Sequence, residues 1–142
     1  MKTIKEGFLR KNLGLGKEAL IKNWLDEHGI KKYTINDDLT IDADKVDLRQ
    51  LGIDELPEYI KFNKVKGFFI LAECPNLISL RGCPKKIDGN FNINYNQKLT
   101  SLDGFPEKIT GNISCIFCGK QFNSSDIRSI CNVRGKVFCI WM

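Results

Sequence analysis

A 22-residue repeat in the middle of the chain constrains the fold more than any other feature of the sequence. Three segments that begin at Val65, Ile87 and Ile109 align without a gap (65 to 87, 87 to 109). Each has a glycine two residues after its first residue, then an alternating stretch and an Asn or a Cys. Leu-x-x-Leu and Gly-x-Pro elements follow in the first two segments. A period this short predicts a solenoid with one strand and one return per coil.

Alternation within each segment predicts which side chains face the core. The inward pairs are Phe69 with Leu71, Phe91 with Ile93, and Ile113 with Cys115. Coils stacked at about 4.8 Å, the spacing of hydrogen-bonded strands, would form a parallel sheet. The repeated glycines, such as Gly89, are expected to allow a tight bend before each strand. The other side of each coil has few helix formers, so we expect extended or 3₁₀ structure there.

The segment Phe91-x-Ile93-x-x-Asn96-x-x-Leu99-x-x-Leu102 resembles the leucine-rich-repeat pattern. In that family an Asn or a Cys follows the strand, and Asn96, Cys74 and Cys118 occupy this place. The resemblance implies that this side chain turns inward and satisfies loop backbone groups that would otherwise be buried unpaired.

The resemblance covers residues 65–122 and departs from the common pattern at two points. The leading apolar residue stands four residues before the strand pair rather than three, and the Gly-x-Pro element is additional. This variant resembles the leucine-rich-repeat-like proteins of bacteriophages, notably crAss-like phages of gut bacteria. The elements Lys2-Thr3-Ile4-Lys5-Glu6 and Tyr33-Thr34-Ile35-Asn36 look similar too.

The segment before the repeat is predicted to be a cap, because a solenoid leaves an apolar face bare at each end. Residues 17–28 fit an amphipathic helix that Gly29 ends. Residues 33–35 and 39–41 flank a turn at residues 36–38, which is typical of a hairpin. Residues 46–57 then predict a degenerate first coil with a longer return loop.

The segment after the repeat is predicted to be a second cap. Residues 124–131 begin with residues that favour a helix N-terminus. Residues 137–141 predict a last strand. This cap would shield Phe122 and the core of the third coil from water.

The predicted fold class is therefore α+β: a short, right-handed, leucine-rich-repeat-like solenoid of about three and a half coils with a parallel sheet. It forms a single domain over residues 1–142. Residues 1–42 are the helix and hairpin cap, residues 43–122 the repeat coils, and residues 123–142 the helix and strand cap.

Composition excludes several classes of protein. Hydrophobic residues make up 42% and charged residues 27% of the chain, the mix of an ordinary soluble domain. No window approaches eighteen consecutive apolar residues, so we expect no transmembrane helix. No long apolar run follows residues 1–6, so we expect no secretory signal peptide. A cytoplasmic location is expected, in the host cell if the chain is phage-encoded.

Six cysteines raise the question of a metal site. Cys115 and Cys118, with Cys131 and Cys139 downstream, would supply four thiolates to a tetrahedral zinc ion. The repeat explains the first two without metal, because they occupy an inward strand position and the Asn/Cys position. We therefore expect no cofactor, and a zinc-stabilised small domain stays an alternative.

The chain offers few groups for catalysis. Its single histidine, His28, lies on the predicted cap helix without a nucleophile near it in sequence. The segment Gly14-Leu15-Gly16-Lys17 lacks the spacing and the preceding strand of a phosphate-binding loop. We expect that the protein is not an enzyme.

Residues between the inward positions are expected to project from the exposed face of the sheet. The candidate protein-binding residues are Phe68, Ile70, Asn90, Asn92, Asn94, Tyr95, Asn112, Ser114, Ile116 and Phe117. Aromatic anchors among adaptable polar groups are typical of a protein contact, although Asn also tolerates a solvated sheet face. The sequence thus predicts a non-catalytic protein-interaction module. The phage resemblance implies an accessory protein that binds a host or phage protein.

Nucleic-acid binding is the alternative function. The net charge of +5 is distributed as a basic, an acidic and a second basic segment, which is weaker evidence than one continuous basic face. The candidate phosphate contacts are Lys85, Lys86, Lys108, Arg128, Arg134 and Lys136. Exposed edges of a short parallel sheet could pair between chains, so we expect a monomer or a weak dimer.

Overall fold

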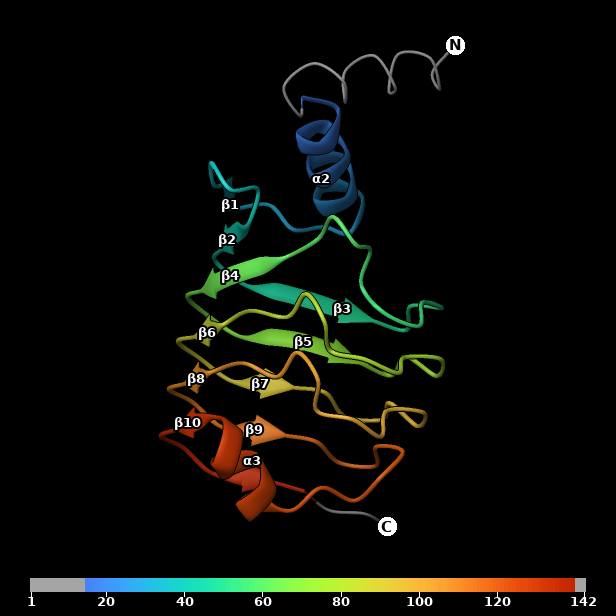
Figure 1. Ribbon diagram of the computed structural model, residues 1–142, viewed down its shortest axis with the longest axis vertical. Helices are drawn as coiled ribbons and strands as arrows, with labels where there is room; N and C mark the ends of the chain where they lie inside the picture. The colour runs from blue at the N-terminus through green and yellow to red at the C-terminus, as the bar shows by residue number, and fades with distance from the viewer. Residues whose placement is uncertain (1–14, 140–142) are drawn as a thin grey trace.

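The computed structural model describes residues 15–139 as a stack of coils (Figure 1). Each coil adds one strand to each of two sheets, and the chain turns from one sheet into the other at the left edge of the view. Sheet A contains, in order, β1 (Tyr33–Ile35), β2 (Ile41–Ala43), β4 (Phe62–Val65), β6 (Lys86–Ile87), β8 (Lys108–Ile109) and β10 (Asn132–Val133). Sheet B contains β3 (Val46–Arg49), β5 (Phe69–Ala72), β7 (Phe91–Asn92), β9 (Ile113–Ser114) and β11 (Val137–Phe138).

Neighbouring strands pair in parallel register, apart from the antiparallel hairpin of β1 and β2. Phe69 pairs with Phe91, and Phe91 pairs with Ile113, so residues one repeat apart lie side by side. This arrangement confirms the predicted α+β solenoid. The stack makes about four turns rather than three and a half, because β10 and β11 add a last coil where only a capping strand was predicted.

The side of each coil that we expected to be extended or 3₁₀ is extended, and its segments pair to form sheet A. The repeated glycines lie at the corner between the two sheets. Glycine is required there because no space is left for a side chain, and not because φ is positive. A Cβ added to Gly89 would lie 2.6 Å from the carbonyl carbon of Gly67 in the preceding coil. By contrast, Gly104 in the return turn has a φ of +88°, which side chains disfavour.

Phenylalanine rings from both sheets and one return loop stack through the core. The ring centroids of Phe62 and Phe69 are 5.2 Å apart, those of Phe69 and Phe91 6.0 Å, and those of Phe91 and Phe105 5.3 Å. The first and third of these pairs are edge-to-face, and such pairs contribute about 0.5–1.5 kcal/mol beyond the area that they bury. The inward positions predicted from alternation are buried in all three repeats.

The N-terminal cap is a helix, α2 (Leu15–Glu27), at one end of the stack (Figure 1). Ile21, Trp24 and Leu25 are buried, as the amphipathic pattern predicted. The helix is followed by Gly29 with a φ of +74°, so the predicted stop is confirmed. The part of the predicted cap in residues 1–14, including the Lys2–Glu6 element, lies outside the described residues.

The C-terminal cap contains α3 (Ser124–Ile130), whose N-cap is Asn123. The Asn123 side chain accepts a hydrogen bond from the backbone of Asp126 at 2.7 Å, and Ile127 is fully buried. The helix lies in the return between β9 and β10, and Phe122 just before it is buried, as the predicted cap required. Ile140 and Trp141 of the predicted last strand lie outside the described residues. Neither described helix is long and apolar enough to cross a membrane.

Asn96 is the one buried polar side chain in the described core. Its Oδ1 accepts a hydrogen bond from the backbone of Cys74 at 2.9 Å. Its Nδ2 donates to the carbonyl oxygens of Leu71 and Ile93, both at 2.9 Å. The side chain therefore joins two coils and satisfies backbone groups, which is the role that the leucine-rich-repeat resemblance implied.

Replacing Asn96 with leucine is expected to lower the free energy of unfolding by about 3 kcal/mol or more, because three buried backbone groups lose their partners. Asn96→Cys is the matched control, since the equivalent thiol of Cys118 donates to the Ile93 carbonyl at 3.2 Å. We expect the free energy of unfolding to fall by about 1–2 kcal/mol less in Asn96→Cys than in the leucine variant. Urea denaturation measures both variants, and equal stabilities would contradict the role assigned to Asn96.

Candidate binding surface

The outer side of sheet B and the turn that follows it hold the ten predicted binding residues. We call this surface the sheet B face. Because the strands are in register, its residues form four columns. The columns of candidate residues are Phe68–Asn90–Asn112, Ile70–Asn92–Ser114, Asn94–Ile116 and Tyr95–Phe117. The structure therefore places the ten residues on one side of the solenoid.

Three asparagines of the face, Asn90, Asn94 and Asn112, accept hydrogen bonds from the backbone of the next coil. The Asn90 side chain accepts a hydrogen bond from the Asn112 amide at 2.8 Å, and the Asn112 side chain accepts one from the Lys136 amide at 2.8 Å. The Asn94 side chain accepts from the Ile116 amide and from the Ser114 hydroxyl, both at 2.7 Å. These asparagines thus have a structural role that the sequence did not reveal.

Aromatic side chains on the same face are exposed. Tyr95 is 46% exposed and Phe117 36%, and their ring centroids lie 5.9 Å apart. Phe68 is also exposed, at the opposite edge of the face. Phe138, which the sequence analysis missed, is 42% exposed and pairs in register with Ser114, so it extends the second column. Matching residues 133–139 to the repeat would have found it.

The column that holds the rings of Tyr95 and Phe117 has a strained backbone. Gln50, Glu73, Tyr95 and Phe117 have φ values of 58°, 57°, 62° and 62°, in the left-handed region that favours glycine. A side chain there costs roughly 1–2 kcal/mol per residue. The contact between the two rings stabilises the folded state by about 0.5–1.5 kcal/mol. The turn requires the backbone conformation but does not require these side chains.

The four candidate zinc ligands are Cys115, Cys118, Cys131 and Cys139. Among the described residues, no group of three or more His, Cys, Asp or Glu side chains is placed to hold a metal ion. The Sγ atoms of Cys115 and Cys139 are 2.6 Å apart, and Cys118 donates to a backbone carbonyl. Burial raises the pKa of Cys115 and of Cys139, and raises those of Cys118 and Cys131 to about 11. Burial therefore favours the protonated thiols at neutral pH, whereas nucleophilic attack uses the thiolate.

His28 packs at the end of α2. Its Nδ1 lies 2.7 Å from the carbonyl oxygen of Trp24, and its ring stacks on that indole at a centroid distance of 4.0 Å. These contacts pack the histidine ring against the predicted cap helix.

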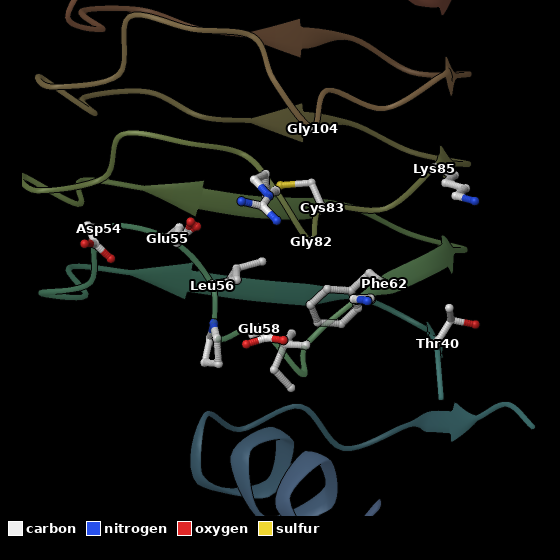
Figure 2. Close-up of a pocket in the computed structure, with 14 residues that line it drawn as sticks. Thr40, Asp54, Glu55, Leu56, Glu58, Phe62, Gly82, Cys83, Lys85 and Gly104 are labelled. Carbon is white, nitrogen blue, oxygen red and sulfur yellow. The ribbon is translucent and has the colours of Figure 1, made fainter. Parts of the chain in front are cut away.

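An open groove of about 770 Å³ lies beside the return loops (Figure 2). Asp54, Glu55 and Glu58 line it from the loop after β3, and Lys85 lines it from the segment that leads into β6. Its lining also includes buried side chains such as Cys83. The sequence did not single out this groove. Its acidic and basic side chains line an open depression rather than an enclosed cavity.

The predicted phosphate contacts are spread over the molecule. Lys86 pairs in register with Lys64 on one side and with Lys108 on the other, which gives three stacked lysines on sheet A. Asp88 forms an ion pair with Lys86 at 3.8 Å. Arg128 donates to the carbonyl oxygens of Val133 and Gly135, so it holds the last coil to α3.

Comparison of the chain with protein-family models, with curated proteins and with solved structures found no match in any of the three.

The left-handed conformation makes a specific prediction at Tyr95. Glycine should be more stable than alanine at this position by about 1 kcal/mol, because both variants lose the ring contact but only alanine keeps the backbone strain. Thermal or urea denaturation of Tyr95→Gly and Tyr95→Ala measures this difference. Arg49, which is exposed on β3 outside the left-handed region, is the control position. There the alanine variant should be more stable than the glycine variant. A less stable glycine variant at residue 95 would contradict the assignment.

Proposed function

We propose that this protein is a non-catalytic interaction module that binds a partner protein through the sheet B face. The observation that carries the proposal is the exposed pair Tyr95 and Phe117 at strained backbone positions. Glycine would relieve the strain, and the return turns of the same coils use glycine where φ is positive, as at Gly104. Two aromatic side chains that do not improve the fold are therefore best explained by a contact outside the chain.

The polar groups of the face support the same function. The carbonyl oxygens of Asn90, Asn94 and Asn112 are held by the next coil. Within the described residues their NH2 groups donate no hydrogen bond, so they remain available to a partner. Because the other side of each amide is fixed, these donors lose little conformational entropy on binding. Fixed donors beside exposed rings suit the backbone and side chains of a protein surface.

The finer biological assignment follows from the repeat. Asn96, Cys74 and Cys118 make the inward contacts that the leucine-rich-repeat resemblance implies, which supports membership of that class. The additional Gly-x-Pro element supports a phage accessory protein, acting in the cytoplasm of the host cell on a host or phage protein. Engagement of His28 in the cap and protonation of the buried thiols support a function without catalysis.

The test uses two variants of the same left-handed column. Tyr95→Gly with Phe117→Gly removes the exposed rings and should weaken partner binding about 100-fold, since two aromatic anchors contribute roughly 1–2 kcal/mol each. Gln50→Gly with Glu73→Gly makes the same backbone change at polar residues, and should leave binding unchanged. Affinity capture from the cells that express the chain identifies the partner, and calorimetry then gives the affinities. Equal binding by both double variants would contradict the proposal.

The three stacked lysines on sheet A favour nucleic-acid binding as a second candidate function. Three phosphate contacts predict that affinity for single-stranded DNA falls about 20-fold when salt is raised fourfold. Fluorescence anisotropy measures this change, with Lys64→Gln, Lys86→Gln and Lys108→Gln combined as the control. Absence of binding at low salt would dismiss this candidate and leave the protein-binding proposal unaffected.

A further inference from the structure

The last coil of the solenoid brings two cysteines into contact across neighbouring strands. Ile113 pairs with Val137 and Ser114 with Phe138, so the next residues in register are Cys115 and Cys139. The Sγ atoms of this pair are 2.6 Å apart. Neighbouring strands are about 4.8 Å apart, within the Cα separation of about 4.4–6.8 Å that disulfides span.

We propose that Cys115 and Cys139 form a reversible disulfide that locks the last coil onto the solenoid. The site is a dithiol for exchange with a small-molecule disulfide such as oxidised glutathione. This inference concerns the stability of the coil and does not depend on what the sheet B face binds.

The reaction balances with that one co-reactant. Cys139 is the more exposed thiol, so its thiolate attacks one sulfur of the glutathione disulfide and breaks the S–S bond. One glutathione leaves and takes up a proton. Cys115 then attacks the Cys139 sulfur of the mixed disulfide and displaces the second glutathione, which takes up the other proton. Two protein thiols are oxidised and one small-molecule disulfide is reduced.

The position of the pair gives the bond its effect. β11 and β10 are the edge strands of the two sheets, and each pairs with its neighbour through only two residues. Short edge ladders open locally at little cost in free energy. A bond between residues 115 and 139 closes the loop that contains α3 and holds both edge strands in place. The oxidised protein keeps the last coil closed, whereas the reduced protein allows it to open.

The sequence contains a signal for this pair that the three-segment alignment missed. Val133-x-Gly135-x-Val137-x-Cys139 repeats Ile109-x-Gly111-x-Ile113-x-Cys115. The offset is 24 residues rather than 22 (109 to 133), because α3 lies in the intervening return.

The experiment treats the folded, full-length chain with oxidised glutathione at mildly alkaline pH, since burial raises the pKa of both thiols. The expected product has lost the mass of two hydrogen atoms. In a non-reducing tryptic digest, residues 109–120 should be linked to residues 137–142. We expect Tm to rise by about 10 °C and to return on reduction with dithiothreitol.

Two variants locate the bond. Residues 109–120 also contain Cys118, whose pKa is raised first by burial and then by the nearby charge of Cys139, so this thiol is the competing partner. Cys118→Ala should keep the cross-link and the Tm shift, and Cys139→Ser should lose both. Loss of the cross-link in Cys118→Ala would overturn the proposal, as would a mixed disulfide with glutathione as the final product. If glutathione disulfide leaves the mass unchanged, the smaller oxidant diamide is applied, and an unchanged mass with both also overturns it.

Discussion

Backbone hydrogen bonds between consecutive coils hold each repeat position beside its equivalent in the next coil. The amide of Phe91 donates to the carbonyl oxygen of Asn112 at 2.9 Å, and the amide of Ile93 donates to that of Ser114 at the same distance. With strands about 4.8 Å apart, side chains of one column necessarily touch. The phenylalanine stack, the asparagine contacts and the thiol pair are three consequences of this single constraint.

The same constraint separates what the fold needs from what the surface offers. The turns after β3, β5, β7 and β9 each need a left-handed residue, because the next side chain must point inward, as Asn96 does. The fold favours glycine at the left-handed position itself, and otherwise does not depend on which side chain occupies it. The polar residues Gln50 and Glu73 occupy this position in the first two coils, and the aromatic residues Tyr95 and Phe117 occupy it in the next two. The aromatic half of the column is therefore the part of the surface on which the proposed binding function rests.

Period and alternation were sufficient to predict the solenoid, the inward residues and the location of the exposed face. Sheet A was not predicted, because strands such as Lys86–Ile87 are too short to show alternation. The last coil was missed because α3 lengthens its return and shifts the repeat. The hydrogen bonds of Asn90 and Asn112 could not be predicted either, since an outward asparagine has the same sequence signature whether it contacts water or the next coil.

The central claim, registered coils that force Tyr95 and Phe117 into the left-handed region, is tested most directly by a nuclear Overhauser spectrum of the isotope-labelled chain. The account predicts cross-peaks between backbone protons of residues 22 positions apart, such as Asn92 and Ser114. It also predicts strong intraresidue peaks between the amide and α protons of Tyr95 and Phe117, which a positive φ brings close. Cross-peaks at a different offset, or weak intraresidue peaks at these two residues, would contradict it.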